Sequence, residues 1–406
     1  MKVLYYHQHF STPRGSTGTR SYEMAQRLIQ HGHSVTMICG SYGMGKTGLD
    51  GPFSRGRRSG SVDGINVIEL ELPYANQDGF VRRSMTFVKF ALRSTWFAFS
   101  ESYDVLFATS TPLTAAIPGI VARMFRRKNF VFEVRDLWPE LPKAMEVISN
   151  PVVLSLLSAL EWTAYRTATR LIGLSPGIAE GIRRRSGPHK PVAMVPNGCD
   201  LDVFQSTADE KRAATDTNSD KLVCIFMGAH GLANGLDAVL DAAAELKARN
   251  RNDIELLLIG DGRCKRALQQ RAIAESLDNV KFLDPVPKTE LHAVLQSADV
   301  GLMILANVPA FYYGTSPNKF FDYIAAGIPV LNNYPGWLAN LIRREAAGVA
   351  VAPDDSAAFA DGLVHMADNR EKRVTMGLNA RRLAERDFDR NKLAEAFVAE
   401  IEATQG

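Results

Sequence analysis

The segment from Ser316 to Val330 contains residues whose types and spacing suit the binding of a nucleotide diphosphate. It reads SPNKFFDYIAAGIPV, in which a proline near the start and a glycine near the end are typical of the two ends of a short helix. Asn318 and Asp322 lie four residues apart, so one helix face carries both. The free N–H groups of the first turn, beside Lys319, suit a phosphate, and Asp322 could accept hydrogen bonds from a ribose diol. An ordinary amphipathic helix with the same caps is the alternative.

Each half of the chain contains a glycine-rich loop directly after its first expected strand. Gly15 and Ser16 belong to the loop Gly-Ser-Thr-Gly, and Gly228 and His230 belong to the loop Gly-Ala-His-Gly. Glycines let the backbone approach a phosphate, and a following helix N-terminus favours the anion. Because neither loop completes a dinucleotide-binding motif, a plain strand-to-helix turn is the alternative in both places.

Two further loops of the second half carry candidate ligand contacts. Gly260 and Arg263 lie in the loop Gly-Asp-Gly-Arg at a strand end, where glycine permits close contact and arginine can reach a phosphate. Val286 precedes a proline in a later loop, where it could form an apolar floor for a nucleobase. A surface turn with a solvated arginine, and a valine that only fills space, are the alternatives.

The composition predicts a globular protein of two domains. The chain has 406 residues, of which 46% are hydrophobic and 22% charged. A formal net charge of only +3 argues against nucleic acid as a partner. The four cysteines are scattered, and no cluster of metal ligands is visible, so neither a disulfide framework nor a bound metal or other cofactor is expected. We expect a cytoplasmic protein, because no signal peptide precedes the first apolar strand and the longest apolar run contains two prolines.

Short apolar strands alternate with helical spacers, which is typical of parallel βαβ units. We therefore expect an α/β protein with two Rossmann-like, doubly wound domains that face each other across a cleft, at residues 1–200 and 201–387. A helix at about 388–406 is expected to pack back on the first domain. Residues 43–64 are expected to form a surface loop and residues 206–220 a linker. The expected strands cover residues 2–6, 34–38, 67–70, 105–109, 130–134, 170–174, 192–195, 222–227, 254–259, 280–283, 300–304 and 330–332.

Six short motifs occur in order along nearly the whole chain. They are GSTGTR with the later helix end HGHSV, then FEVRDLWPE, VPNGCD, the stretch from Met227 to Asp237, IGDG and SPNKFFDYIAAG. Together they resemble the retaining GT-B glycosyltransferases of family 4. The resemblance is greatest to the fucosaminyltransferase-like branch, which acts in bacterial surface-polysaccharide synthesis.

The resemblance implies roles for residues on the donor side of the reaction. Asp322 takes the place of the second glutamate of the family's acidic pair, which binds the donor ribose. Gly15 and Ser16 match the loop that contacts the donor diphosphate, and Asn318 and Lys319 match the helix start beneath it. The donor implied by the family is a UDP-sugar, with an N-acetylated or deoxy hexose as the transferred group.

The chain also departs from the family pattern in two places. The first acidic position of the pair falls near Gly314, which carries no carboxylate. The family's basic run after the first strand of the second domain is replaced by the sequence Leu-Ala-Asn-Gly at 232–235. Neutralisation of the donor phosphates therefore has to depend on Lys319, Arg263 or helix dipoles.

The motif around Arg135 and Asp136 lies where relatives carry an active-site His-Asp pair. By resemblance, the sugar passes to an acceptor hydroxyl by front-face attack with retained configuration, without a metal, and Lys319 stabilises the leaving diphosphate. Asp136 could orient or deprotonate the acceptor hydroxyl, Arg135 could bind an acceptor phosphate, and Trp138 could contact the acceptor. A structural ion pair at a strand end is the alternative. His7, His9 and His230, near other strand ends, are expected to be satisfied structural histidines.

Residues 82–100 are expected to form a helix with a basic and aromatic stripe made by Arg82, Lys89, Arg93 and Trp96. Apolar side chains flank the stripe, and more basic residues follow at 123–128. This pattern suits a helix that lies on anionic lipid, although a helix packed on its own sheet is the alternative. Because relatives act on polyprenyl-diphosphate-linked sugars, we expect a peripheral enzyme at the inner face of the cell membrane.

Two other functions remain open at this point. A nucleotide-sugar epimerase on the same fold would interconvert a UDP-sugar without any acceptor. A non-catalytic nucleotide-sugar-binding protein would bind the donor without turnover, and the missing carboxylate and basic run are compatible with it.

Overall fold

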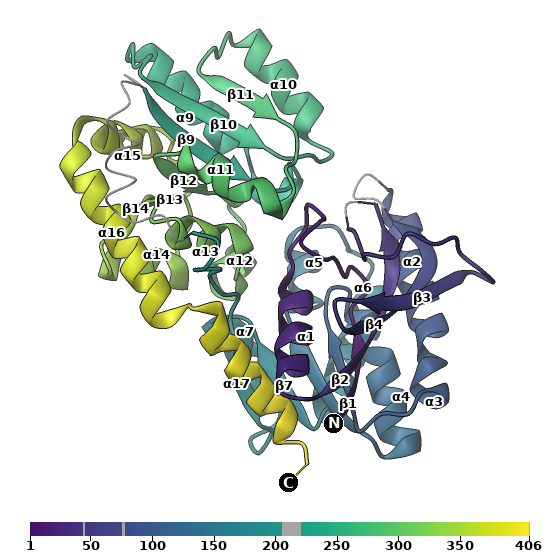
Figure 1. The fold of residues 1–406 in the computed structure, drawn as a ribbon. Helices are drawn as coiled ribbons and strands as arrows, with labels where there is room; N and C mark the ends of the chain where they lie inside the picture. Colours follow the sequence, from purple (N-terminus) through teal and green to yellow (C-terminus); the bar gives the residue numbers. More distant parts are fainter. Residues whose placement is uncertain (44, 75–77, 205–220, 406) are drawn as a thin grey trace. The chain divides into compact units, whose positions relative to one another are not determined.

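The computed structural model describes residues 1–43, 45–74, 78–204 and 221–405 (Figure 1). They form two compact units. The first unit combines Met1–Pro196 with Tyr313–Ser316 and Asn391–Gly406, and the second combines Asn197–Tyr312 with Pro317–Arg390. The expected linker at 206–220 lies outside the described residues.

The first unit is built on an eight-stranded sheet in the order β3-β4-β2-β1-β5-β6-β7-β8. Every neighbouring pair is parallel except β3 and β4. The chain order reverses between β1 and β5, so the loops after these strands leave from adjacent strand ends, where open α/β sheets bind ligands. The strands are β1 (Lys2–Tyr6), β2 (Ser34–Tyr42), β3 (Arg57–Val62), β4 (Ile65–Tyr74), β5 (Val105–Thr109), β6 (Asn129–Val134), β7 (Arg170–Gly173) and β8 (Val192–Met194).

Helices cover both faces of this sheet, which makes it doubly wound. Alternate residues of β1 point to opposite faces, so Tyr6 joins a core with α2, α4, α6 and α7, and Tyr5 joins a core with α1 and α17 (Figure 1). Ser175 caps α7 by accepting a hydrogen bond from the Ile178 N–H (3.1 Å). The helices are α1 (Arg20–Gln30), α2 (Phe80–Thr95), α3 (Phe97–Ser100), α4 (Ile117–Arg126), α5 (Glu140–Ala144), α6 (Pro151–Thr167), α7 (Pro176–Ser186) and α17 (Arg390–Glu402), with a 3₁₀ turn η1 at Leu113–Ala116.

The second unit contains a parallel six-stranded sheet in the order β11-β10-β9-β12-β13-β14. Its chain order reverses between β9 and β12. Its strands are β9 (Leu222–Met227), β10 (Ile254–Ile259), β11 (Val280–Leu283), β12 (Val300–Met303), β13 (Val330–Asn332) and β14 (Gly348–Ala350). Its helices are α9 (Asp237–Ala248), α10 (Lys265–Ala274), α11 (Leu291–Gln296), α12 (Pro309–Gly314), α13 (Asn318–Ala325), α14 (Trp337–Arg344), α15 (Ser356–Asp368) and α16 (Arg370–Asp387), with 3₁₀ turns η2 (Leu232–Asn234) and η3 (Lys288–Glu290).

Helix α13 has the bounds that its proline and glycine predict. It begins directly after Pro317 and ends before Gly327, which has a φ of 63° that glycine adopts without strain. Two hydrogen bonds close the end, from the Gly327 N–H to the Ile324 carbonyl (3.0 Å) and from the Ile328 N–H to the Tyr323 carbonyl (2.9 Å). They form the bonding pattern by which a left-handed glycine terminates a helix.

Three elements differ from the expectation. The supposed loop at 43–64 contains strand β3, which pairs antiparallel with β4 although its side chains are mostly exposed. The single helix expected at 82–100 is two helices, α2 and α3, that meet at Trp96. Helices α15 and α16, which precede the C-terminal helix, had not been assigned from the sequence.

Candidate functional site

Two glycine loops of the second unit interlock at the carboxyl ends of β9 and β10. The Gly228 N–H donates to the Ile259 carbonyl (3.0 Å), and the His230 N–H donates to the Asp261 carbonyl (2.9 Å). A Cβ at Gly260 would lie 1.8 Å from the Gly228 carbonyl oxygen, so a side chain cannot be accommodated there. The two loops therefore present bare backbone at the strand ends, as close approach of a ligand requires.

Helix α13 is fixed against the same strand ends by Tyr323. Its hydroxyl donates to the Ile225 carbonyl (3.1 Å) and accepts from the Met227 N–H (3.1 Å). Lys319 lies four residues earlier and therefore on the same side of the helix. The first turn of α13 thus points its lysine toward the loop that follows β9.

The Lys319 ammonium occupies a restricted position beside that loop. Its Nζ donates to Asn234 Oδ1 (3.1 Å) and lies 3.8 Å from the centre of the Phe226 ring. A Cβ at Gly228 would lie 3.3 Å from Nζ, so the absence of a side chain leaves room for the ammonium. Burial lowers the pKa of Lys319 to about 7. In the described chain the ammonium has no carboxylate partner, and a bound anion would supply the missing charge.

His230 is buried and lacks hydrogen bonds. Its side chain has 0% relative exposure, and neither ring nitrogen has a partner among the described residues. Burial, with smaller contributions from Lys265 and Lys319, lowers the pKa of His230 to about 4 against the opposing effect of Asp261. The expectation of a satisfied histidine is therefore wrong here. A neutral imidazole that leaves a donor unused in a buried place costs stability unless a ligand engages it.

Asp322 and Asn318 lie on α13 as expected, but their surroundings differ. Asn318 is exposed at the first turn, whereas Asp322 has 8% relative exposure. Burial raises the pKa of Asp322, Asp200 acts in the same direction, and Lys288 and Arg390 lower it. Asp322 is therefore a buried carboxylate in a charged neighbourhood.

The structure places Lys265, rather than Arg263, at the strand ends of β10 and β11. The Lys265 ammonium donates to the carbonyls of Gly260 (2.9 Å) and Leu283 (3.0 Å). Arg263 is exposed and makes no hydrogen bond or ion pair in the part of the chain that the structure describes, and Val286 is half-buried in the following loop. Lys265 and Asn234 were missed from the sequence, because only the fold shows which neighbouring loop a polar side chain reaches.

In the first unit, Arg135 belongs to a buried ionic network at the ends of β5 and β6. Arg20 donates to Glu133 Oε2 through Nε (3.0 Å) and Nη2 (2.7 Å), and Thr109 donates to Oε1 (2.7 Å). Arg135 lies 3.4 Å from Glu133 Oε1 and donates to Thr109 Oγ1 (2.8 Å) and Ser21 Oγ (3.0 Å). Burial alone would raise the pKa of Glu133, but the two arginines lower it. Most of the contacts of Arg135 described here are therefore structural, in line with the alternative of an ion pair at a strand end.

Asp136 lies outside this network and accepts a hydrogen bond from Thr111 Oγ1 (3.1 Å). Burial raises its pKa, whereas Thr111 and Arg135 lower it. Trp138 is half-buried and packs against the core on the α2 face.

His7 and His9 lie at the end of β1 beside Arg135. Burial lowers the pKa of His7 well below its usual value and that of His9 to about 3, and Arg135 adds to both effects. The Nδ1 atoms of both rings lack partners among residues that the structure describes, so the expectation of satisfied histidines is wrong for these atoms too. Unpaired polar atoms at the reversal point of the first sheet mark a second candidate binding surface.

Gly15 and Ser16 follow β1 in the same unit. Gly15 is buried, and its N–H donates to the Thr12 carbonyl (3.1 Å), whereas Ser16 is exposed. No group of three or more His, Cys, Asp or Glu side chains that could hold a metal occurs within residues 1–43, 45–74, 78–204 and 221–405. The metal-free reaction stays a prediction.

Two family models match the chain, one for each half. Residues 15–198 match the glycosyl transferase 4-like domain, and residues 207–383 match the glycosyl transferases group 1. The chain is built from two glycosyltransferase domains. The two matched domains correspond to the two halves of the chain, each of which is built on a largely parallel sheet.

Similar proteins include both partial and full-length matches. A D-inositol 3-phosphate glycosyltransferase of Corynebacterium efficiens is 27% identical over 47% of this chain and 46% of its own length, so the chain matches about half of that relative. A putative colanic acid biosynthesis glycosyl transferase, WcaI of Escherichia coli, is 21% identical over 99% of this chain and 100% of its own. The crystal structure of Anabaena Alr3699/HepE in complex with UDP-glucose has a TM-score of 0.68 at 16% identity, covering 99% and 100% of the two chains, which shows a shared fold.

Proposed function

We propose that this glycosyltransferase moves a hexose from a UDP-sugar to a lipid-linked saccharide during surface-polysaccharide synthesis, with retained configuration. WcaI, which is similar over its full length, carries a name that refers to colanic acid biosynthesis. HepE, which shares the fold, binds UDP-glucose. The transferred group is proposed to be an N-acetylated or deoxy hexose, as the resemblance to the fucosaminyltransferase-like branch implies.

One observation carries the donor assignment: an uncompensated ammonium and an unpartnered buried imidazole lie in the same glycine-lined place. Lys319 Nζ lies beside Gly228, and the loop of Gly228 continues into His230. A diphosphate offers the negative charge and the acceptor oxygens that these two groups lack. Asp322, on the same helix, would accept hydrogen bonds from the ribose diol.

The chemistry at this place follows from the charge that develops on the leaving group. The bond between the sugar C1 and the diphosphate oxygen breaks, and C1 bonds to the acceptor oxygen on the same face of the ring. The acceptor proton passes to the departing phosphate. Lys319 and the imidazole N–H of His230 stabilise the growing negative charge, because groups already aimed at that charge need not reorganise during the reaction.

On the acceptor side, the proposal gives different roles to Asp136 and Arg135. Asp136 keeps one carboxylate oxygen apart from its bond to Thr111 and would orient the acceptor hydroxyl. Arg135 is tied to Glu133, Thr109 and Ser21, so we assign it mainly to positioning and only secondarily to an acceptor phosphate. Trp138, with one side in the core, would contact the acceptor through its remaining surface.

The exposed face of α2 and α3 supports a membrane-bound acceptor. Leu92 and Trp96 have 68% and 67% relative exposure, whereas Phe90 and Phe97 of the same helices are buried. No helix among the described residues is long and apolar enough to cross a membrane. We propose that this face rests on the anionic inner leaflet, with exposed apolar side chains at the lipid and Lys89 near the headgroups. The exposed apolar residues of this face are Val81, Met85, Val88, Leu92, Trp96 and Phe99.

Two assays test the proposed function. A thermal-shift panel of nucleotides and nucleotide sugars should show selective stabilisation by UDP and UDP-hexoses, because only a ligand of the folded state raises its stability. A transfer assay should then show product only when a polyprenyl-diphosphate saccharide is present. Interconversion of UDP-sugars without an acceptor would indicate an epimerase. Donor binding without turnover, in wild type and Asp136→Asn alike, would indicate a binding protein.

A further inference from the structure

The first unit contains a cavity of about 840 Å³. It is bounded by residues 41–43 and 45–50 at and after the end of β2, by the end of β4, by the start of α2 and by Arg14, which precedes Gly15. All of these residues belong to one unit. Cavities of this size bind small organic ligands. No residue proposed above for the donor or acceptor lines it.

Two cations of the cavity have no counter-ion among the described residues. Arg58 is neutralised by Glu69, to which it donates through Nε (2.9 Å) and Nη2 (3.0 Å). Arg82 lies 3.3 Å from Asp78. Arg14 and Lys46, in contrast, are exposed and form no ion pair within the described ranges.

One lining carboxylate, Asp50, is exposed and also has no ion-pair partner there. Two unpaired cations, Arg14 and Lys46, therefore line the cavity beside one unpaired carboxylate, Asp50. This excess of positive charge favours binding of an anion.

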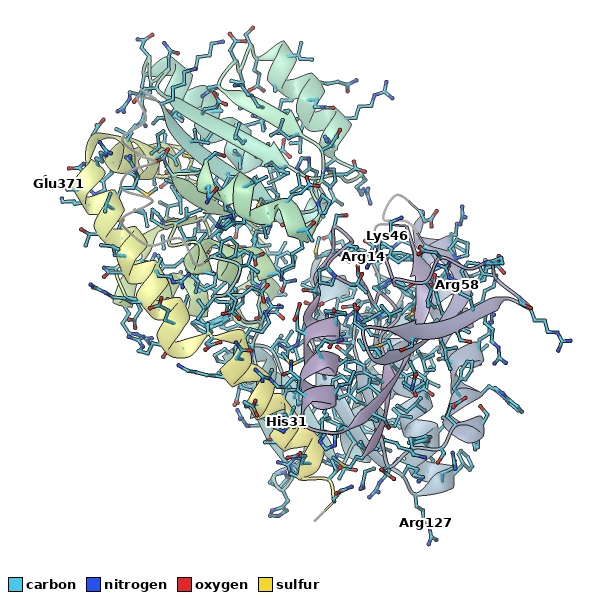
Figure 2. The ribbon with its side chains drawn as sticks, viewed as in Figure 1. Arg14, His31, Lys46, Arg58, Arg127 and Glu371 are labelled. Atoms are coloured by element: carbon cyan, nitrogen blue, oxygen red, sulfur yellow. The ribbon has the colours of Figure 1, made fainter. Side chains whose placement is uncertain are left out.

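The loops that carry these cations are fixed to each other. The Thr12 N–H and hydroxyl both donate to the Lys46 carbonyl (2.8 Å each), and the Lys46 N–H donates to Ser11 Oγ (3.1 Å). Figure 2 shows Arg14 and Lys46 close together at one end of the unit, with Arg58 nearby. These hydrogen bonds hold the backbone of Lys46 against the segment that leads to Arg14.

Aromatic rings form one wall of the same cavity. Tyr42 and Tyr74 line it, with ring centres 5.5 Å apart, and His9 packs behind them at 5.2 Å and 4.6 Å from their centres. Phe87 stacks on Tyr74 at 5.6 Å. A cavity lined by packed aromatic rings and by polar groups is suited to a ring ligand such as a sugar.

We infer that this cavity binds a sugar that carries a negatively charged group, and that it is the part of the acceptor site that recognises an anionic saccharide. The ring would lie against Tyr42 and Tyr74, and the anionic group would bind Arg14 and Lys46. The assignment to the acceptor rests on the proposed function, whereas binding of the anionic sugar does not. A sugar phosphate and a sugar carboxylate share this chemistry, so the test separates them.

The test measures binding of glucose 1-phosphate, glucuronate and glucose to the whole protein by saturation-transfer NMR. The charged sugars should bind roughly tenfold more tightly than glucose, and added salt should reduce that preference. The variant Arg14→Gln/Lys46→Gln should lose the preference, and Tyr42→Leu should weaken all three probes. Arg127→Gln, an exposed cation at the opposite end of the unit (Figure 2), is the control and should change nothing. The preferred charged sugar identifies a phosphate or a carboxylate.

The outcomes separate this inference from the proposed function. Equal binding of glucose and the charged sugars, or an unchanged preference in the double variant, would overturn the inference. A double variant that loses affinity for UDP as much as for the charged sugars would also overturn it, because Arg14 and Lys46 would then serve the donor. If the sugars bind as expected but no UDP-sugar is ever transferred, the proposed function fails and the sugar site remains.

Discussion

The Lys319 ammonium lies 3.8 Å from the centre of the Phe226 ring, on the side where Gly228 has no side chain. The aromatic face offers partial compensation for a charge that has no carboxylate partner among the described residues. Burial of the ammonium lowers the pKa of Lys319 to about 7. The charge state of this lysine therefore changes within the physiological pH range.

Binding of UDP-glucose should become weaker as pH rises above about 7. The ammonium is present below its pKa, and above it Lys319 must take up a proton from solution for each donor that binds, so affinity should fall up to ~10-fold per pH unit. Calorimetry between about pH 6 and about pH 8.5 measures this, with UDP-glucose chosen because its diphosphate is a diester without a titration near 7. Lys319→Arg, which stays charged, is the control. An identical pH profile in both proteins would exclude Lys319 as the titrating group.

The substitution His230→Leu should stabilise the free protein and weaken the donor complex. Removing an unpartnered polar ring from a buried place should raise the free energy of unfolding by about 1–3 kcal/mol. The same change removes a hydrogen-bond donor for the diphosphate, so the UDP dissociation constant should rise. Urea unfolding and calorimetry give the two values, and a loss of stability would show that the ring serves the fold instead.

Asp322→Ala should remove the enzyme's ability to distinguish UDP from 2′-deoxy-UDP. If the carboxylate accepts from the ribose diol, the wild type should bind UDP about 1–3 kcal/mol more tightly than the variant does. The wild type should bind 2′-deoxy-UDP more weakly than UDP by a similar free energy. The variant should bind the two nucleotides almost equally. Asp278→Ala, which removes an exposed carboxylate of the same unit, is the control. Undiminished discrimination in Asp322→Ala would contradict the ribose assignment.

Leu92→Glu and Trp96→Glu should each reduce sedimentation with anionic vesicles at low salt. These side chains are exposed on the face proposed to contact lipid, and a carboxylate there adds a desolvation cost and repels anionic headgroups. Ile273→Glu makes the same change at a side chain of the second unit with 79% relative exposure and should have no effect. Wild-type protein that stays in the supernatant would end the membrane proposal.

Glu133→Gln should destabilise the protein by about 3–5 kcal/mol, because it leaves Arg20 buried without its partner. The pKa of Glu133 is lowered in the folded protein, so its contribution is present above the unfolded value and is lost as pH falls through the folded value. Chemical unfolding near neutral and acidic pH measures both effects. Glu140→Gln, at an exposed position of the same unit, provides the comparison.

The sequence was sufficient for the features that local chemistry determines. The bounds of α13 follow from Pro317 and Gly327, and the parallel strands follow from short apolar runs between helices. Strand β3 was not predicted, because alternation of buried and exposed residues is the signal of a half-buried strand and β3 lacks it. Its pairing with β4 is set by the neighbouring strand rather than by its own side chains.

The state of each candidate side chain depends on contacts that a sequence does not contain. Arg135 and Asp136 are adjacent, yet Arg135 is held by Glu133 whereas Asp136 accepts a hydrogen bond from Thr111. His230 could be placed after a strand, but its lack of partners becomes visible only when the surrounding loops are in position. The cavity lined by Arg14 also includes residues after β2, at the end of β4 and at the start of α2, and no local sequence motif predicts it.

Helix α17 has a consequence for how the chain acquires its structure during synthesis. Its Phe397 ring packs 5.0 Å from Phe107 and 6.5 Å from Tyr5, in the middle of the first unit. Translation delivers Tyr5 long before Phe397, so the nascent amino-terminal unit keeps an open apolar groove until α17 has been made. Premature termination before α17 would thus release a polypeptide with its earliest-made sheet uncovered, a natural substrate for chaperones and proteases.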